Sequence, residues 1–409
     1  MTRQDRILRG HVTASMIGPL QLPSRDALVA GLTRIAASGP DARVGLTFDE
    51  GETWGFDEST LGALCESIVQ VAAPIDPDTA TSALTGFADT MDHDRPLTLI
   101  IAGDYLVQLF EHRIGDGAIM LGLPAALVAV ANGEEVPEWL AAASSAHPLR
   151  DALMTTFAAH PGRILDVVKA RGGVVPSDPK SADRDWTPDY SIEFALGSPE
   201  TNSAIRAWTK EQDAPVSFTS AITVMLRRAL EASGIECSNR VTAILDARRY
   251  LPEGTATTGN FITGIPLAVA DADDPTLIER ALRSTVETAR PLAALAAGLA
   301  KHAAGEREPA LPTTAPVDAR AHVVMSNMGV SRALENLPWR DGTGVGRSMF
   351  SNRPIGPEDI SVLVMMIGGN IHLTATFHGN IFPSDAVARA LEMVANRPLE
   401  LFDRRVPTA

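Results

Sequence analysis

Residues 97–117 read LTLIIAGDYLVQLFEHRIGDG, and this stretch carries the clearest structural signal in the chain. Two runs of strand-forming residues, 97–102 and 105–111, flank the turn-forming pair Gly103-Asp104, so we predict a β-hairpin. His112 follows the second strand directly, which places its imidazole at the edge of a sheet, where ligands commonly bind. Small and apolar residues then resume at helical density, and Pro124 is expected to kink or end that helix.

The rest of the chain alternates between helical and extended patterns. Ser217 can cap a helix that Gly234 stops, and Ser384 can cap the last helix. Alternating helices and strands in both halves predict an α/β protein. The segments that carry these patterns are helices at 25–36, 59–71, 217–232 and 384–395, strands at 241–245 and 322–325, and two strands within 361–377 joined by residues 368–370.

The length of the chain, 409 residues, predicts more than one domain, because a single hydrophobic core stops growing at about 250–300 residues. The clearest break is the run of Gly, Pro, Ser and Asp at 171–190, which has the composition of a linker. We therefore predict an N-terminal subdomain over residues 1–172, a linker over 173–190 and a C-terminal subdomain over 191–409.

The composition argues against several functional classes. Thirty-five basic and 50 acidic residues give a net charge of −15, so neither nucleic acid nor an anionic membrane surface is expected as a partner. The longest apolar run, 118–131, is shorter than the roughly 18 residues of a membrane span, and the N-terminus lacks the apolar region of a secretory signal. Two isolated cysteines favour inert, buried thiols over a disulfide framework. We expect a cytoplasmic protein without a membrane span.

His112, Asp116 and Gly117 form the pattern H-x-x-x-D-G. Histidine is the side chain whose ordinary pKa lies nearest neutrality, so His112 is a candidate general base. Asp116 can point away from the ring after such a turn and then needs its own cation. The alternative is a structural histidine, satisfied by a local hydrogen bond beside a turn aspartate.

Two later segments add candidates. Arg248 follows a buried strand, where an arginine needs a carboxylate partner, and Asp116 is the candidate for that pair. The triplet Gly259-Asn260-Phe261 follows eleven residues after Arg248, and Ser326-Asn327-Met328-Gly329 puts small polar groups just past another apolar run.

These four patterns, H-x-x-x-D-G at 112–117, D-x-R at 246–248, G-N-F at 259–261 and S-N-x-G at 326–329, resemble in order and spacing the chloramphenicol acetyltransferase-like superfamily. That superfamily includes CoA-dependent acyltransferases, polyketide-associated acyltransferases and nonribosomal peptide condensation domains. The resemblance extends over nearly the whole chain. Glu111 departs from it, because many members carry two consecutive histidines.

The resemblance implies two α/β subdomains in a V with an active-site tunnel between them. His112 would deprotonate a hydroxyl or amine of a small-molecule acceptor, a secondary metabolite or a lipid, for transfer of an acyl group from acyl-CoA or a phosphopantetheinyl thioester. Ser326 and Asn327 would lie near the reacting carbonyl. The remaining implied roles are structural and belong to Asp116 paired with Arg248, to Gly117 and to Asn260.

Other sites and functions remain as alternatives. The glycine-rich stretch 342–348 fits neither a Walker loop nor a dinucleotide fingerprint, although Arg347 or Arg353 could contact a CoA phosphate. We expect no permanently bound cofactor and no metal, although Asp89 and residues 92–94 could in principle hold one. Besides a CoA-dependent enzyme, the alternatives are a condensation-type enzyme fed by an acyl or peptidyl carrier protein, and a catalytically silent docking module.

Overall fold

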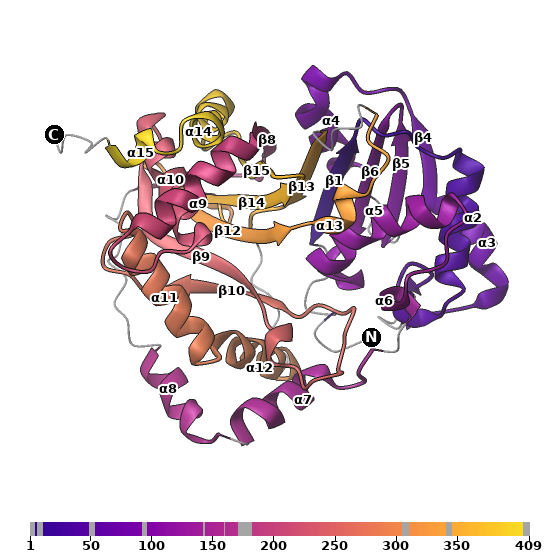
Figure 1. Ribbon diagram of the computed structural model, residues 1–409, viewed down its shortest axis with the longest axis horizontal. Helices are drawn as coiled ribbons and strands as arrows, with labels where there is room; N and C mark the ends of the chain where they lie inside the picture. Colours follow the sequence, from indigo (N-terminus) through magenta and orange to yellow (C-terminus); the bar gives the residue numbers. More distant parts are fainter. Residues whose placement is uncertain are drawn as a thin grey trace.

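Two mixed β-sheets form the framework of the molecule, and a group of helices packs on each (Figure 1). This computed structural model describes residue 5 and residues 11–48, 54–91, 96–141, 144–158, 160–170, 182–304, 311–340 and 346–403. Helices and strands alternate along most of the chain, so the α/β class expected from the sequence is confirmed.

The N-terminal sheet is built around the hairpin of β5 and β6, whose bounds match those predicted. β1 pairs with β6 antiparallel, and β4 pairs with β5 parallel. The hairpin forms here because Gly103 adopts a positive φ of 66° in the turn, a conformation that glycine adopts without strain. In sheet order the strands are β13 (Arg347–Asn352), β1 (Val12–Gly18), β6 (Tyr105–Glu111), β5 (Leu97–Ala102) and β4 (Val69–Ala72).

Both faces of this sheet are covered. Alternate residues of β6 point to opposite faces, so Phe110 packs in the core beneath α2 and α5 while Val107 packs in the core beneath α4. The helices of this half are α2 (Arg25–Ala36), α3 (Leu61–Ile68), α4 (Ala80–Asp89), α5 (Gly117–Ala131) and the short α6 (Glu138–Ala141).

The C-terminal sheet has three parallel strands at its centre and antiparallel strands at both edges. Alternate residues of its central strands, such as Val323, Met325 and Val362, are buried in the core against the helices. In sheet order the strands are β10 (Ile262–Leu267), β9 (Cys237–Asp246), β12 (Ala321–Val330), β14 (Asp359–Ile367), β15 (Asn370–His378) and β8 (Tyr190–Gly197).

Helix α10 starts where the sequence predicts, because the Ser217 hydroxyl accepts a hydrogen bond from the Ser220 amide at 3.2 Å. Its apolar face packs on the sheet together with α9 and α14. The helices of this half are α9 (Pro199–Glu211), α10 (Phe218–Ala232), α11 (Pro275–Glu287), α12 (Arg290–Ala303), α13 (Arg332–Glu335), α14 (Ser384–Asn396) and α15 (Glu400–Asp403).

One strand crosses between the halves. β13 follows the C-terminal strand β12 in the chain but pairs with β1, which makes it the edge of the N-terminal sheet (Figure 1). Its unpaired edge lies on β15, where the Ser348 amide donates to His372 Nδ1 at 3.3 Å and the Phe350 amide donates to Thr374 Oγ1 at 3.2 Å. The two sheets are therefore joined by this strand.

The remaining elements are short and connect the two halves or border them. Residues 173–181 of the predicted linker lie outside the described part of the chain. The short elements are α7 (Pro148–Leu153), α8 (Gly162–Ala170), β2 (Thr47–Phe48), β3 (Trp54–Gly55), β7 (Asp183–Asp185) and β11 (Thr314–Pro316).

Pro124 does not end α5, which runs on to Ala131, because Leu123 and Leu127 beside the proline are fully buried and their packing outweighs the lost backbone bond. Two other local predictions were wrong. Ser384 is the first residue of α14 rather than its cap, which is Pro383. The apolar run at 59–71 changes from helix to strand at Val69, because its end pairs with β5.

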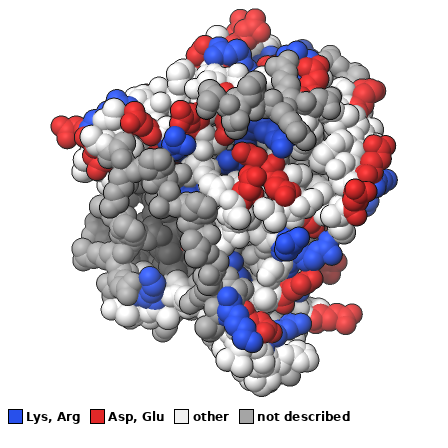
Figure 2. Space-filling view, turned by 90° about the vertical axis from the view of Figure 1, so that its left-hand side faces the viewer, with Lys and Arg blue, Asp and Glu red and all other residues white. Residues whose placement is uncertain are grey.

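The composition makes predictions about the charge distribution on the surface and about the length of the helices. On the face shown in Figure 2, Lys and Arg are interspersed with Asp and Glu, without a continuous basic patch over the described residues. No helix in the described ranges is long and apolar enough to cross a bilayer.

Candidate active site

His112 stands where β6 ends, in the 3₁₀ turn η4 (His112–Ile114). Its backbone amide donates to the carbonyl of His11, the residue before β1, at 2.8 Å, so the start of the turn remains hydrogen-bonded beside β1. Gly115 lets the turn pack tightly on α5, because a Cβ at this position would lie 2.6 Å from Ile119 Cγ1. The turn leaves the His112 side chain 8% exposed, on the wall of a cavity between the two sheets.

The hydrogen bonds of Asn260 fix the tautomer of His112. The Asn260 Nδ2 group donates to the His112 carbonyl at 2.6 Å and to Asp5 Oδ1 at 3.2 Å, so its Oδ1 faces the ring, 2.7 Å from His112 Nδ1. A carboxamide oxygen only accepts, and Nδ1 must therefore carry the ring proton. This arrangement leaves the Nε2 lone pair of His112 available.

Burial keeps the imidazole neutral. Desolvation lowers the pKa of His112 below its ordinary value, and the opposing influences of Asp116 and the Asn260 hydrogen bond do not offset it. At neutral pH the ring is therefore unprotonated at Nε2, which is the state a general base requires.

The carboxylate of Asp116 binds Arg248 and two backbone amides rather than the His112 ring. It is fully buried and caps α5 by accepting from the Ala118 amide at 3.1 Å. Arg248 binds it through two nitrogens, at 2.9 and 3.1 Å, and the Phe261 amide donates to it at 2.9 Å. The structure thus brings together Asp116 and Arg248, from opposite halves of the chain.

Arg248 stands in the 3₁₀ turn η6 (Arg248–Tyr250), just past β9. Besides Asp116, it donates to the carbonyls of Thr257 and Gly259, at 3.1 and 2.8 Å. The same arginine therefore positions the loop that carries Asn260, and through it the ring of His112.

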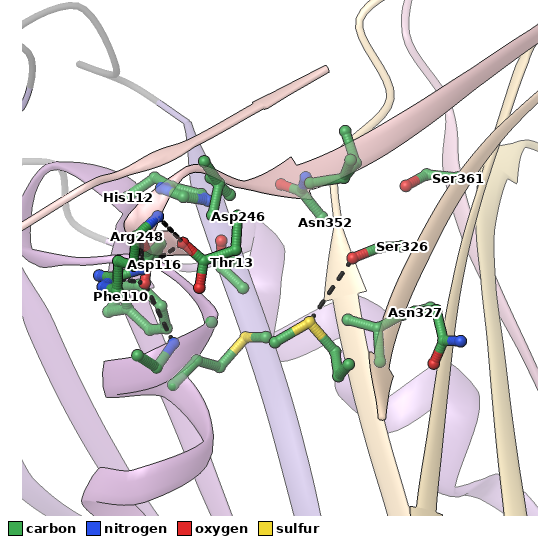
Figure 3. Close-up of a pocket in the computed structure, with 17 residues that line it drawn as sticks. Thr13, Phe110, His112, Asp116, Asp246, Arg248, Ser326, Asn327, Asn352 and Ser361 are labelled. Carbon is green, nitrogen blue, oxygen red and sulfur yellow. Dashed lines mark hydrogen bonds and ion pairs between the residues drawn. The ribbon is translucent and has the colours of Figure 1, made fainter. Parts of the chain in front are cut away.

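The cavity measures about 210 Å³ and lies between the two sheets (Figure 3). In the view of Figure 3, Asn352, Ser326 and Ser361 lie across the cavity from His112 and Arg248. The lining is mixed, because apolar side chains share it with nine polar or charged ones. Its residues are Thr13, Phe110, His112, Asp116, Gly117, Ala118, Met120, Ile244, Asp246, Arg248, Ile262, Ser326, Asn327, Met328, Asn352, Ser361 and Leu363.

Ser326 and Asn327 both line this cavity, but their side chains differ in what they can do. The Asn327 amide is already engaged, since Nδ2 donates to Thr219 Oγ1 at 2.8 Å and Oδ1 accepts from the Gly329 amide at 2.9 Å. Among the described residues, the Ser326 hydroxyl donates only to the sulfur of Met328, a weak acceptor, at 3.6 Å (Figure 3). Ser326 is therefore the better placed of the two to donate to a ligand.

Gly117, in the first turn of α5, lies against the side chain of Met328. A Cβ at this position would collide with the end of the Met328 side chain. Glycine here leaves room for the methionine inside the cavity.

Arg347 and Arg353 lie outside the cavity lining, and internal contacts occupy both guanidinium groups. Arg347 donates to the Pro77 carbonyl at 2.6 Å. Arg353 binds Asp89 Oδ1 at 2.6 Å and stacks on the ring of Tyr190. A contact of either with a CoA phosphate stays a prediction, and the structure brings neither of them to His112.

The acidic loop that was considered for a metal is only partly described, because residues 92–95 lie outside the described ranges. No group of three or more His, Cys, Asp or Glu side chains among the described residues could hold a metal ion.

Both cysteines are buried and form no disulfide, and burial raises the pKa of the Cys237 thiol to about 12.

Sequence reasoning missed two buried ion pairs that support the site. Arg43 binds Asp5 at 3.1 Å, and Asp5 in turn accepts from the Asn260 amide at 3.0 Å. Glu111, the position at which the sequence departs from the resemblance, pairs with Arg113, whose guanidinium lies 3.5 Å from the Phe48 ring centre. The Arg43–Asp5 pair has no signal in the sequence pattern, because it depends on how distant segments meet. Glu111 and Arg113 are only two residues apart, but nothing in the pattern indicated that both would be buried.

Comparison with known proteins identifies the fold. No protein-family model and no curated protein matches the chain. Solved structures do match over nearly its full length. The TRI3 trichothecene 15-O-acetyltransferase from Fusarium sporotrichioides is 13% identical, with a TM-score of 0.61, over 98% of this chain and 92% of that one.

Two further matches are a condensation domain and a polyketide synthase associated protein. The first condensation domain of the calcium-dependent antibiotic synthetase is 15% identical, with a TM-score of 0.57, over 97% of this chain and 92% of that one. Polyketide synthase associated protein 5 from Mycobacterium tuberculosis is 15% identical, with a TM-score of 0.53, over 98% of both chains. The chain therefore has the fold that these acetyltransferase, condensation-domain and polyketide synthase associated structures share.

Proposed function

We propose that the protein is an acyltransferase that moves an acyl group from a thioester to a hydroxyl or amine of a small-molecule acceptor. The observation that supports this most strongly is the state of His112, a buried neutral imidazole whose Nδ1 is bound by Asn260 and whose Nε2 is available. The fold supports the same reaction class, because it is shared with a trichothecene acetyltransferase and with condensation domains.

The reaction needs one base and no acyl-enzyme. Nε2 of His112 accepts the proton of the acceptor as its oxygen or nitrogen attacks the thioester carbonyl. The carbon–sulfur bond of the tetrahedral intermediate then breaks, and the imidazolium returns its proton to the leaving thiolate. Since a thioester is already activated, holding both substrates against His112 supplies much of the remaining acceleration.

The oxyanion of the tetrahedral intermediate needs a donor. Ser326 suits this role because its hydroxyl lines the cavity and has only the Met328 sulfur as its acceptor. Asn327 suits it less, because its amide nitrogen is bound to Thr219.

The thioester is either acyl-CoA or an acyl group on a carrier protein. Arg347 and Arg353, the candidates for a CoA phosphate, already have internal partners. The mixed charges of the face in Figure 2 give no continuous basic patch for an acidic carrier there. We therefore keep both donors in the proposal, with a secondary metabolite or lipid as the acceptor and the cytoplasm as its location.

Replacing His112 with alanine tests the proposal. Free-thiol release from acetyl-CoA, and separately from an acyl-loaded carrier protein, is measured in the presence of a panel of small alcohols and amines. Without its base, the His112→Ala variant is expected to lose at least about 10²-fold in kcat with the donor that the wild-type protein uses.

The matched control is His302→Ala, an exposed histidine near the end of α12, which should retain the wild-type rate. Wild-type turnover by a folded His112→Ala variant would contradict the assignment of the base. Absence of acceptor-dependent thiol release from both donors in the wild-type protein would favour the silent docking module.

A further inference from the structure

Two polar side chains of the cavity have no role in the reaction described above. Thr13 of β1 and Asn352 of β13 both line the cavity, and they are directly opposite each other in the β1–β13 ladder. Side chains of directly opposed residues have Cβ atoms about 4.5–5.5 Å apart, so these two can reach a single polar atom.

Of the two side chains, Thr13 gives the stronger evidence for a group bound in the cavity. Its side chain is 2% exposed, and its Oγ1 has no hydrogen-bond partner among the described residues. A buried hydroxyl without a partner is unfavourable to the folded state, and Thr13, unlike the equally unpartnered Ser15, lines the cavity, so a group bound in the cavity can supply the missing partner. The Asn352 carboxamide likewise makes no side-chain hydrogen bond within the described part of the chain, and Ser361 adds a second hydroxyl to the same cavity.

The charges of the cavity restrict what this group can be. Arg248 is the one cation among the described lining residues, and its guanidinium is bound to Asp116 and Asp246. A carboxylate or phosphate would therefore meet no free positive charge. A hydroxyl, which both donates and accepts, matches the hydroxyl of Thr13 and the carboxamide of Asn352.

We propose that Thr13 and Asn352 bind a second, neutral hydroxyl group of the acceptor, so that the preferred acceptor is a small diol or polyol. This inference rests on the proposed acyl transfer. The nucleophilic hydroxyl lies at His112 Nε2, and the apolar residues Ile244 and Leu363 of the same cavity contact the carbon skeleton between the two hydroxyls.

The test compares trans-cyclohexane-1,2-diol with cyclohexanol, which share a ring and differ by one hydroxyl. The shift in melting temperature that each alcohol causes is measured without any thioester, on wild type, Thr13→Val and Asn352→Leu. The diol should stabilise the wild-type protein more than cyclohexanol does, and the difference should disappear in both variants. With a donor thioester present, the diol-to-cyclohexanol ratio of kcat/KM should fall roughly 3- to 10-fold in each variant, the loss expected for one neutral hydrogen bond.

Ser15→Ala is the matched control. Ser15 lies two residues along β1 from Thr13, is also buried with an unpartnered hydroxyl, and does not line the cavity. This variant should keep the wild-type preference for the diol. If Thr13→Val and Ser15→Ala behave alike in every measurement, the Thr13 hydroxyl is only structural.

Other outcomes separate this inference from the proposed function. Equal or absent shifts with the two alcohols in wild type would overturn the diol site. A rise in KM for acetyl-CoA in Thr13→Val, with an unchanged acceptor ratio, would assign Thr13 to the donor and overturn the inference as well. Failure of acyl transfer with every donor would contradict the proposed function alone, because the melting measurements need no thioester.

Discussion

At the scale of single residues, the carboxamide of Asn260 determines which nitrogen of His112 can accept a proton. Its Oδ1 holds the proton on Nδ1, and its Nδ2 is bound to the His112 carbonyl and to Asp5. Asn260 is thus a positioning residue, since it acts on the substrate only through the imidazole.

Replacing Asn260 with leucine should therefore change the pH profile as well as the rate. In the wild-type protein, kcat should fall on acidification with a midpoint below about 6.5, because burial lowers the pKa of His112 and activity needs the neutral ring. The Asn260 hydrogen bond raises the pKa of His112, so its loss in Asn260→Leu should move the midpoint to lower pH and reduce kcat by about tenfold or more. Steady-state kinetics between about pH 5 and 8 measure both effects.

An outcome in which Asn260→Leu lowers kcat uniformly, with an unmoved acidic midpoint, would contradict the positioning role. It would show that Asn260 matters only to the folded structure. Unchanged kinetics across the pH range would show that the ring keeps its tautomer without this contact.

At the scale of elements, Asp116 joins three segments that meet only in the folded chain. It caps the start of α5, binds Arg248 in η6 and accepts from the backbone that leads into β10. Its own side chain is fully buried, and that of Arg248 is 21% exposed.

Replacing Asp116 with alanine should lower the free energy of unfolding by about 3–5 kcal/mol, because the largely buried Arg248 guanidinium then loses its closer carboxylate and keeps the longer contact with the half-exposed Asp246, at 3.4 Å. Urea denaturation of the wild type and the variant measures the difference. Asp385→Ala removes the carboxylate of an exposed pair, with Arg389, and should leave the urea midpoint nearly unchanged. Equal midpoints for Asp116→Ala and wild type would show that the buried pair contributes little.

Local elements could be predicted well from the sequence, and contacts between them could not. The β5–β6 hairpin and α2 have the predicted bounds because their signals, a Gly-Asp turn and a helical apolar period, are local. Pro124 shows the limit of such signals, since the packing of α5 on its neighbours overrides a helix breaker. The polar pair of Thr13 and Asn352 was invisible, because their opposition depends on strand register between segments 339 residues apart.

At the scale of the whole molecule, β13 is the feature that sequence reasoning did not anticipate. Nothing in residues 347–352 indicates that this strand leaves its own half to complete the other sheet. The candidate site depends on this crossing, because it brings Asn352 to the wall that Thr13 shares. The motifs were enough to name His112, Asp116 and Arg248 as candidate site residues. The shape of the cavity could not be predicted, because segments from the whole chain form its walls.

His372 lies where β13 rests on β15, so the joint between the two sheets contains a titratable group. Its Nδ1 accepts from the Ser348 amide, and its side chain is 1% exposed. Burial lowers the pKa of His372 to about 4, so the ring stays neutral in the folded protein over most of the acidic range. The unfolded chain, in which the pKa is about 6.5, takes up a proton there first.

Acidification should therefore weaken this joint. Between about pH 7.5 and 5, protonation of His372 in the unfolded chain alone should lower the free energy of unfolding by about 2 kcal/mol, because stability falls wherever the unfolded state binds more protons. His372→Asn keeps an acceptor near the Ser348 amide and removes the titration, so its stability should fall by about 2 kcal/mol less over the same interval. Urea midpoints at several pH values measure this difference, with His302→Asn on exposed α12 as the control that should retain the wild-type slope. A variant that loses as much stability as wild type on acidification would show that His372 is protonated in the folded protein too, and that the joint does not depend on its neutral form.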